Sequence, residues 1–423
     1  MHSMKKENEV IAVIGLGYVG LPLAIEFGKL RNVIGYDILK NRIKELSRRF
    51  DSTLEISEDE FKAAKFLRFT NNCQDLSRAN VYVITVPTPV DASNRPDMTA
   101  LRESTELIAK FLKKGDIVVY ESTVYPGATE EFCVPILEKI SSLIYKKDFN
   151  CGYSPERINP GDKTRKISTI KKVVSGSNRK TADILMTLYG EIISAGLHRA
   201  SSIKVAEASK VLENTQRDVN IALINEFSLI FDKLGIDTKE VLDAAKTKWN
   251  FLDFSPGLVG GHCIGVDPYY IAYKSEVAGY HPELINASRK VNNKMTDYIA
   301  NKLIDLMIGK SINISKSKIL VLGITFKENC SDVRNSKTLE LISKLKAKGI
   351  TVDAHDPWVA EVDANIQMYD WPIHKKYDAV ILSVPHAKIL EYGIKRIKGI
   401  MKDKSVLYDL KGALFKGESD ARL

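Results

Sequence analysis

Residues 10–22 read VIAVIGLGYVGLP, and this stretch decides the fold of the first part of the chain. An apolar run ending in Gly15, Gly17 and Gly20 predicts a strand at 10–14, a tight turn and a helix at 18–30. The amide groups at the start of such a helix attract a pyrophosphate. Asp37 ends the next predicted strand, at the distance expected for an acid that binds a ribose hydroxyl. The pattern therefore predicts a dinucleotide site.

The Asp37 carboxylate favours NAD over NADP, because it would repel a 2′-phosphate. Lys40 and Arg42 weaken that preference, since basic side chains could accept such a phosphate. The alternative to a dinucleotide site is a glycine turn that only packs a helix against a strand.

Strands and helices alternate twice along the chain, which indicates two parallel sheets with crossover helices. We predict an α/β fold in which two Rossmann-like doubly wound domains are joined by a long central helix, at about 203–234, and a small all-α middle domain. The predicted strands lie at 10–14, 32–37, 80–86 and 116–120, then at 318–322, 351–355, 378–384 and 405–408. The predicted domains span 4–198, which contains the dinucleotide motif, 199–309, which contains the long helix, and 310–423, which contains the second set of strands.

Composition narrows the functional classes. The chain has 423 residues, and its net charge of +9 fits either a lysine-rich surface or anionic ligands. No stacked-aromatic or recognition-helix pattern favours nucleic acid. The five cysteines form no CxxC pair, so we expect neither a disulfide framework nor a metal site, and a cytoplasmic location. The longest apolar run, at 10–25, is shorter than the roughly 20 residues that a membrane span requires, and we expect no membrane partner.

Residues 260–270 read GGHCIGVDPYY and contain a candidate nucleophile, Cys263. A thiol beside a bound dinucleotide can trap an aldehyde and allow a second oxidation, so the expected product is a carboxylate. Asp267, four residues after Cys263, is the candidate acid of the same motif. Pro268 is expected to keep a helix from running through the motif, and His262 is expected to point away from Cys263 in an extended segment. A small buried cysteine without chemistry is the alternative.

Three further groups of residues are candidates. Lys210, Asn214 and Arg217 share one face of the long predicted helix, where they could stabilise an oxyanion or could simply be solvated. The loops at 86–89 and 121–127 follow predicted strands at the edge where open α/β sheets bind ligands. The segment 154–162 adds Glu156 as a candidate acid or base and Arg157 as an anion-binding fork.

These residues closely resemble the UDP-glucose/GDP-mannose dehydrogenase family along almost the whole chain. The resemblance is carried by the segments VITVPTP, YESTVYPG, YSPERINPGD, KVAEASKVLENTQRDVNIALINE, GLVGGHCIGVDPYY and GITFKENCSDVRNS. Within the family the chain is similar to the UDP-N-acetylhexosamine 6-dehydrogenases of bacterial surface polysaccharide synthesis.

The resemblance implies specific roles. Cys263 would be the nucleophile, Lys210 and Asn214 would stabilise the oxyanion, and Asp267, Glu156 and Thr123 would handle protons and the hydrolytic water. The implied cofactor, NAD, would contact Gly15, Gly17, Tyr18, Val19, Gly20, Asp37, Arg42, Thr88, Thr123 and Arg334. The implied UDP-sugar would contact Arg157, Ile158, Lys210, Asn214, Arg217, Gly260 and Lys327. The resemblance also implies that the domain at 4–198 binds NAD, that the domain at 199–309 carries the catalytic cysteine, and that the domain at 310–423 binds the UDP part of the substrate. It further implies a homodimer through the long central helix.

The implied reaction is a four-electron oxidation at C6 of UDP-N-acetylglucosamine or UDP-N-acetylgalactosamine, through a thiohemiacetal and a thioester, for O-antigen or capsule synthesis. Val266 stands where the UDP-glucose enzymes carry a lysine, which argues against UDP-glucose as the substrate. Thr247 and Trp249 stand where the mannosamine enzymes carry a histidine and an arginine, which argues against UDP-N-acetylmannosamine. Three alternatives stay open: a UDP-glucose 6-dehydrogenase, a single-step hydroxyacid-type dehydrogenase, and a non-catalytic NAD sensor that pairs through the long helix.

Overall fold

The computed structural model describes residues 9–158, 165–362 and 366–423. Its internal contacts divide the chain into two compact units. The first unit runs to Glu213 and includes Tyr269–Tyr280, and the second comprises Asn214–Pro268 and His281–Leu423. Residues 4–8 of the predicted first domain and residues 159–162 of the predicted loop at 154–162 lie outside the described residues.

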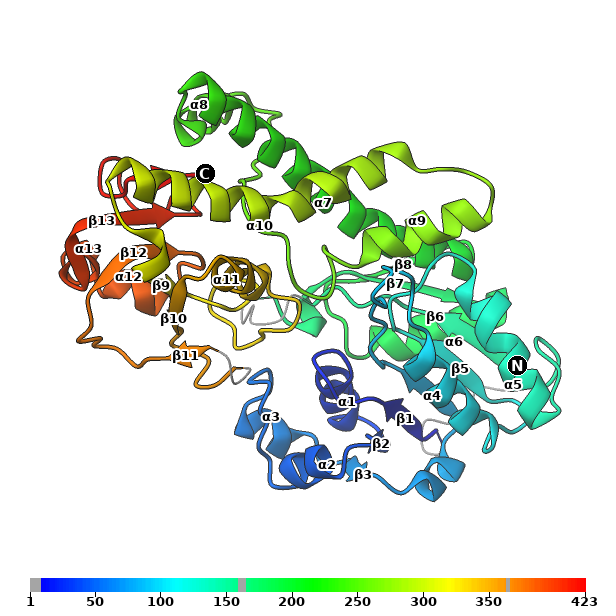
Figure 1. The fold of residues 1–423 in the computed structure, drawn as a ribbon. Coiled ribbons are helices and arrows are strands. Elements are labelled where there is room, and N and C mark those ends of the chain that lie inside the picture. The colour runs from blue at the N-terminus through cyan, green and yellow to red at the C-terminus, as the bar shows by residue number, and fades with distance from the viewer. Residues whose placement is uncertain (1–8, 159–164, 363–365) are drawn as a thin grey trace. The chain divides into compact units, whose positions relative to one another are not determined.

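Both sheets consist of short strands connected mainly by helices (Figure 1). The strands are β1 (Ile11–Ile14), β2 (Val33–Tyr36), β3 (Leu67–Thr70), β4 (Val81–Ile84), β5 (Ile117–Tyr120), β6 (Asn150–Tyr153), β7 (Lys172–Gly176), β8 (Leu197–Arg199), β9 (Lys318–Leu322), β10 (Thr351–His355), β11 (Gln367–Met368), β12 (Tyr377–Leu382), β13 (Met401–Asp409) and β14 (Ala421–Arg422). The α-helices are α1 (Gly20–Gly28), α2 (Lys40–Ser47), α3 (Glu58–Ala63), α4 (Thr99–Ala109), α5 (Val134–Ser141), α6 (Arg179–Gly190), α7 (Ile203–Leu234), α8 (Thr238–Ala245), α9 (Asp267–Val277), α10 (Glu283–Gly309), α11 (Lys337–Ala347), α12 (Ala387–Glu391) and α13 (Ile394–Gly399). The short helices are η2 (Cys73–Arg78), η3 (Thr129–Cys133), η4 (Ile167–Thr169) and η5 (Ile314–Lys316).

The sheet of the first unit has the strand order β3-β2-β1-β4-β5-β6-β7-β8. Its strands pair in parallel, except that β7 runs antiparallel to β6. Strand order reverses between β1 and β4, and ligands of open α/β sheets bind outside the carboxyl ends of the strands at such a reversal. Because β7 is antiparallel to β6, it begins at the edge of the sheet where β5 and β6 end.

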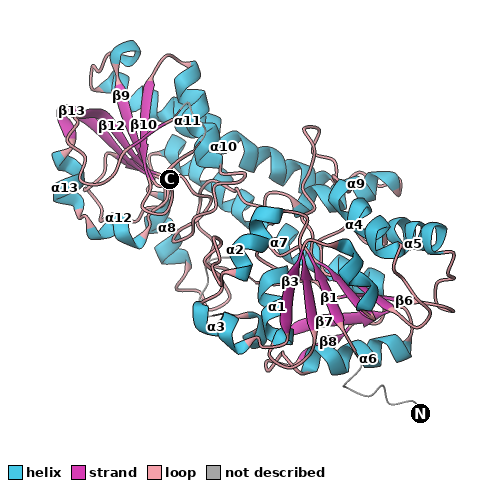
Figure 2. Ribbon diagram, turned by 90° about the horizontal axis from the view of Figure 1, so that it is seen from below, coloured by secondary structure: helices cyan, strands magenta, loops and turns pink. Residues whose placement is uncertain are grey.

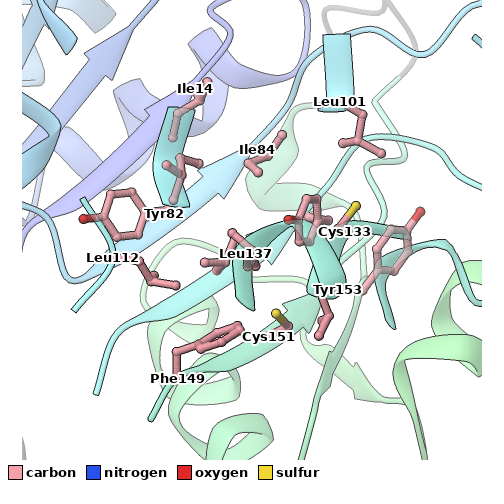
Figure 3. Packing of buried hydrophobic residues seen from close by; sticks show 14 of the residues in the cluster. Ile14, Tyr82, Ile84, Leu101, Leu112, Cys133, Leu137, Phe149, Cys151 and Tyr153 are labelled. Carbon is pink, nitrogen blue, oxygen red and sulfur yellow. The ribbon is translucent and has the colours of Figure 1, made fainter. Parts of the chain in front are cut away.

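Alternate residues of each strand point to opposite faces of this sheet, and both faces are covered. Ala12 and Ile14 join a buried cluster with side chains of α4 and α5, whereas Ile11 and Val13 join a cluster with side chains of α1 and α6. The first cluster also contains Tyr82, Phe149 and Tyr153, which pack together with Cys133 and Cys151 (Figure 3). Burial on both faces explains why these strands read as continuous apolar runs.

The sheet of the second unit has the strand order β11-β10-β9-β12-β13-β14, and its neighbouring strands are parallel. Helices α10 and α11 cover one face, and α12 and α13 cover the other. Figure 2 shows β9, β10, β12 and β13 side by side. The predicted fold class, two Rossmann-like sheets with a helical middle region, is confirmed.

Helix α7 has the predicted bounds, but the polar face with Lys210 and Asn214 is buried and not solvated. The exposed side chains include large apolar ones that recur at helical spacing: Val205, Leu212, Leu223, Phe227, Ile230 and Leu234. The buried ones include Glu207, Lys210, Asn214, Asp218 and Asn225, which are polar. The solvated-face interpretation of Lys210 and Asn214 was therefore wrong, although Arg217 is exposed. Among the described residues, no helix combines the length and apolar character needed to cross a membrane.

Candidate functional site

The GxGxxG turn has the geometry of a pyrophosphate cradle. Gly15 has a φ of +91°, and its N–H donates to the Tyr36 carbonyl over 2.9 Å. A Cβ at Gly20 would lie 1.9 Å from the Gly15 carbonyl oxygen, so helix α1 can start there only with glycine. A Cβ at Gly17 would meet no protein atom within 4 Å. At Gly17 the missing side chain therefore leaves the backbone open to a ligand, which fits a bound dinucleotide. Tyr18 and Val19 complete the turn ahead of α1.

Asp37 lies at the end of β2 and holds the same turn. One carboxylate oxygen accepts the N–H of Leu16 over 2.9 Å, and the other accepts the N–H of Leu39 over 2.9 Å. Its side chain is only partly buried, as the predicted contact with a ribose requires.

Arg42, which the sequence offered as a cation for NADP, is already occupied. Its Nε donates to the carbonyl of Leu16 over 3.0 Å, and its two Nη atoms contact Glu45 at 2.6 Å and Asp51 at 2.9 Å. The Asp51 side chain is fully buried. Because two carboxylates neutralise this guanidinium, the arrangement favours NAD over NADP.

The loops that follow β4 and β5 are joined by hydrogen bonds, which brings two predicted cofactor residues together. The Thr88 hydroxyl donates to the Thr123 carbonyl over 2.7 Å, and the Tyr270 hydroxyl donates to the Thr88 carbonyl over 2.9 Å. The Ser122 hydroxyl donates to the Val86 carbonyl over 2.7 Å. Thr88 and Thr123 thus lie at the carboxyl edge beside the point where strand order reverses.

Glu156 and Lys210 meet at this same edge. The Lys210 ammonium donates to the backbone carbonyl of Glu156 over 2.7 Å. The Glu156 carboxylate accepts the N–H groups of Arg157 and Ile158 over 2.6 and 2.8 Å, and the ammonium of Lys172 over 2.9 Å. Burial alone would raise the pKa of Glu156, but Lys172 and the two amides hold it below its ordinary value. Arg157, predicted to bind an anion, pairs with Glu213.

Two further charged residues lie here: Lys172, which was not predicted, and Glu121, which begins the predicted loop at 121–127 but was given no role of its own. The Lys172 ammonium lies 2.8 Å from a Glu121 carboxylate oxygen, and both side chains are buried. A lysine directly before the two β-branched residues of KVVSG was the signal that could have indicated Lys172.

In the second unit, three predicted residues form a continuous chain. The Asn214 side-chain amide donates to the Asp267 carboxylate over 2.5 Å, and Arg217 donates to the Asn214 side-chain carbonyl over 3.0 Å. Asn214 is 1% exposed and Asp267 is 2% exposed. The buried amide and carboxylate therefore fix one another, and Asp267 begins helix α9.

Cys263 is exposed and lies in a turn just ahead of α9, rather than in an extended strand. Its backbone carbonyl accepts the N–H groups of Val266 over 3.1 Å and of Asp267 over 2.9 Å. The expectation of an extended segment was wrong, and Pro268 lies in the first turn of α9, where proline is tolerated. A helix N-terminus stabilises a nearby thiolate, which suits a nucleophile.

His262, the residue before Cys263, contacts Asp332 and Phe326 of the second unit. Its Nδ1 lies 3.6 Å from a carboxylate oxygen of Asp332, and its ring lies edge-on to Phe326. Burial, assisted by the positive charge of Arg334, lowers the pKa of His262. Arg334, predicted to contact the cofactor, forms two hydrogen bonds to Asp332, over 3.0 and 2.8 Å.

A pocket opens at the carboxyl edge of the second sheet. It contains the predicted substrate residues Gly260 and Lys327, and its other lining residues are Leu258, Thr325, Phe326, Glu328, Lys337, Thr338, Ser383, Val384 and Lys411. A Cβ at Gly260 would lie 2.6 Å from the Asn335 carbonyl oxygen, so glycine is needed for this packing. The three ammonium groups outnumber the one carboxylate, which suits the phosphates of a nucleotide.

The second sheet has an aspartate, Asp356, at the position that corresponds to Asp37, but its carboxylate is buried. Asp356 follows β10 as Asp37 follows β2, and it accepts the N–H of Ile324 over 2.8 Å as Asp37 accepts that of Leu16. Asp356 is buried, however, and it lies 3.0 Å from Nε2 of the fully buried His386. The corresponding carboxylate of the second sheet is therefore unavailable to a ribose, and the dinucleotide site belongs to the first sheet.

Comparison with known proteins agrees with this division. Models of the UDP-glucose/GDP-mannose dehydrogenase family match residues 9–193 as its NAD binding domain, 204–294 as its central domain and 320–416 as its UDP binding domain. A UDP-N-acetyl-D-glucosamine 6-dehydrogenase of Pseudomonas aeruginosa is 55% identical over 417 residues, 98% of this chain and 99% of the relative. The enzyme of that name from Salmonella typhi is 51% identical over 417 residues, 98% of each chain. The solved UDP-D-ManNAc dehydrogenase of Pyrococcus horikoshii has a TM-score of 0.89 at 29% identity and covers 98% of each chain.

Proposed function

We propose that this chain, which belongs to the UDP-glucose/GDP-mannose dehydrogenase family and uses NAD as its oxidant, converts C6 of a UDP-N-acetylhexosamine to a carboxylate. The observation that carries the two-step oxidation is the exposed Cys263 thiol ahead of α9, whose first residue is held by Asn214. UDP-N-acetylglucosamine is the favoured sugar, because two relatives at 55% and 51% identity are named for it. UDP-N-acetylgalactosamine differs by one epimeric hydroxyl and remains within the proposal.

The reaction consumes two NAD and one water for each sugar. NAD supplies an acceptor for the hydride that leaves C6. In the first oxidation, the C6 alcohol loses a hydride and its hydroxyl proton and becomes an aldehyde. The Cys263 thiolate then forms a C–S bond to that aldehyde, and the thiohemiacetal loses a second hydride to give a thioester. Water breaks the C–S bond, which releases the carboxylate and restores the thiol.

Lys210 and Asn214 are proposed to stabilise the negative charge on the C6 oxygen. They are one turn apart on α7, and removal of one such donor typically costs about 3 kcal/mol of transition-state stabilisation. Asp267 and Thr123 are proposed to handle protons and to place the hydrolytic water. Glu156 was expected to share that task, but both its carboxylate oxygens already accept hydrogen bonds, which supports a holding role.

The nucleotide half of the substrate is proposed to bind the pocket of the second unit, with Lys327, Lys337 and Lys411 around its phosphates. Arg157, Ile158 and Arg217 remain proposed contacts of the sugar. The division into an NAD-binding domain, a central domain and a UDP-binding domain at 4–198, 199–309 and 310–423 likewise remains a proposal.

We further propose a cytoplasmic homodimer that serves surface polysaccharide synthesis, joined through α7. The support for the dimer is the exposed apolar stripe of α7, which includes Leu223, Phe227 and Ile230. Phe227→Asp should yield monomers by light scattering, whereas the exposed Glu226→Lys should leave the dimer intact. A parent protein that is monomeric at working concentration would contradict the proposal.

The substrate proposal is tested by incubating the protein with NAD and each of UDP-N-acetylglucosamine, UDP-N-acetylgalactosamine and UDP-glucose. The expected result is uronate formation with an N-acetylated sugar at a kcat/KM at least tenfold above that with UDP-glucose. Preference for UDP-glucose would identify the protein as a UDP-glucose 6-dehydrogenase. One NADH per sugar would favour a single-step dehydrogenase, and NAD binding without turnover would favour a sensor.

A further inference from the structure

A buried cation bridges two carboxylates at the carboxyl edge of the first sheet. The Lys172 ammonium lies 2.8 Å from Glu121 and 2.9 Å from Glu156, and the three side chains are 4%, 0% and 7% exposed. The Tyr189 hydroxyl of α6 donates to the other carboxylate oxygen of Glu121. All four residues belong to the first unit.

The topology of the sheet explains this meeting. Glu121 directly follows β5, Glu156 comes three residues after β6, and Lys172 begins β7. Because β7 is antiparallel to β6, its first residue lies at the edge where the two parallel strands end. A parallel strand in this place would put its first residue at the opposite edge.

This triad connects two parts of the proposed catalytic machinery. Glu121 lies two residues before Thr123, at the start of the loop at 121–127. The Glu156 backbone carbonyl receives the Lys210 ammonium over 2.7 Å, and the Glu156 carboxylate is held by Lys172 and two backbone amides. The Lys172 ammonium is thus the one group in the triad that contacts both the Thr123 loop and the segment beneath Lys210.

Stability alone does not account for such a triad. Burying ionised groups costs several kcal/mol each, and well-packed apolar side chains in their place are often equally stabilising. The two glutamates hold the pKa of Lys172 above its ordinary value although burial would lower it, so the ammonium stays charged. A buried ionic arrangement of this kind defines a geometry, because each charge must keep its partners.

We propose that Lys172 is a positioning residue, which fixes the Glu156 carbonyl under the Lys210 ammonium and the start of the Thr123 loop beside it. The inference rests on the proposed function in one respect, the role of Lys210 at the reacting oxygen. Lys172 itself contacts neither the sugar nor NAD in this role. Its loss should therefore lower kcat while the KM for NAD stays nearly constant.

The test compares Lys172→Met with Lys172→Arg, and with Arg31→Met as a matched control. Arg31 also bridges two carboxylates, Glu9 and Glu191, at 2.6 Å each, and its side chain is 8% exposed, but it lies at the amino edge of the same sheet. We expect Lys172→Met to lower kcat at least thirtyfold with the KM for NAD within twofold. Lys172→Arg should recover kcat to within about fivefold of the parent. Arg31→Met should lower the melting temperature and leave the kcat of the folded enzyme within twofold.

The pH profile of kcat separates positioning from a general loss of stability. Without the Lys172 ammonium the pKa of Glu156 rises, so the decline in kcat toward low pH should begin at a higher pH in Lys172→Met than in the parent and Arg31→Met. If Lys172→Met does not fold, Lys172→Gln keeps a hydrogen-bond donor without the charge and should show the same kcat loss and the same decline.

The inference would be overturned by parental kcat and pH profile in the Lys172 variants, or by equal kcat effects of Lys172→Met and Arg31→Met. Failure of the proposed function has a different signature, since Lys210→Ala would then retain the parental kcat.

Discussion

Glu207→Gln is expected to change the stability of the protein with a sign that depends on pH. Glu207 lies on α7 and is fully buried, one turn before Lys210. Its two carboxylate oxygens accept the N–H groups of Gly127 over 2.5 Å and of Thr129 over 2.9 Å. It therefore holds the end of the loop that carries Thr123. Burial raises the pKa of Glu207 from 4.5 to about 7.

The direction follows from proton linkage. Because the folded state binds this proton more tightly than the unfolded state, the stability it contributes is complete below pH 4.5 and is lost as pH rises through about 7. The full loss is about 3 kcal/mol, of which about 2.5 kcal/mol falls between pH 5 and pH 8. Glutamine does not ionise, but its single carbonyl oxygen leaves one of the two N–H groups without an acceptor, at a cost of about 1 to 3 kcal/mol at every pH.

The assay is urea denaturation of both proteins at pH 5 and at pH 8. Taking the difference between the proteins at each pH removes the contribution of every other titrating group. The variant should be less stable at pH 5, and relative to the parent it should gain about 2.5 kcal/mol by pH 8. A difference that is constant with pH would refute the argument, because it would mean that burial does not raise the pKa of Glu207.

Two further predictions concern the dinucleotide site. Gly20→Ala should destabilise the protein by about 3 kcal/mol, because its Cβ would lie 1.9 Å from the Gly15 carbonyl oxygen, whereas Gly17→Ala should fold normally and raise the KM for NAD about tenfold. Melting temperatures and KM values check this pair, and equal stability of the two variants would count against it. Asp51→Asn should release Arg42 and raise the kcat/KM ratio of NADP to NAD about tenfold, since one buried carboxylate no longer holds the guanidinium. An unchanged ratio would show that Arg42 plays no part in the choice.

The sequence predicted the elements of this fold well because their signals are local. The glycines at 15, 17 and 20 and the apolar strand runs identified the first sheet, and 203–234 proved to be the bounds of α7. The strands β3, β6, β7 and β8 were not predicted, because their sequences LRFT, NCGY, KVVSG and LHR lack the continuous apolar run of β1, β4 and β5. The antiparallel direction of β7 follows from tertiary pairing and has no local signature.

The faces of α7 show why the candidate site was only partly predictable. Periodicity separates two faces of a helix, but it does not say which face is covered. Here Lys210 and Asn214 are buried because they bond to Glu156 and Asp267, which are 54 and 53 residues away. Leu223 and Phe227 are exposed, although the apolar face of a helix usually packs against the core. Lys172 was not predicted for the same reason, since its partners Glu121 and Glu156 follow two other strands, β5 and β6.

The family, the fold class and the use of NAD were predicted from the sequence and are confirmed. The resemblance rests on motifs whose order extends over almost the whole chain, which a local pattern cannot imitate. The roles of the individual residues, including Cys263, stay predictions.

The central claim, a double oxidation through Cys263, is tested most directly by counting NADH per UDP-N-acetylglucosamine consumed, in the parent and in Cys263→Ala. We predict two NADH and one uronate per sugar from the parent, and no uronate from the variant. Two NADH and normal uronate formation from Cys263→Ala would contradict the account, because the second oxidation would then proceed without the thiol.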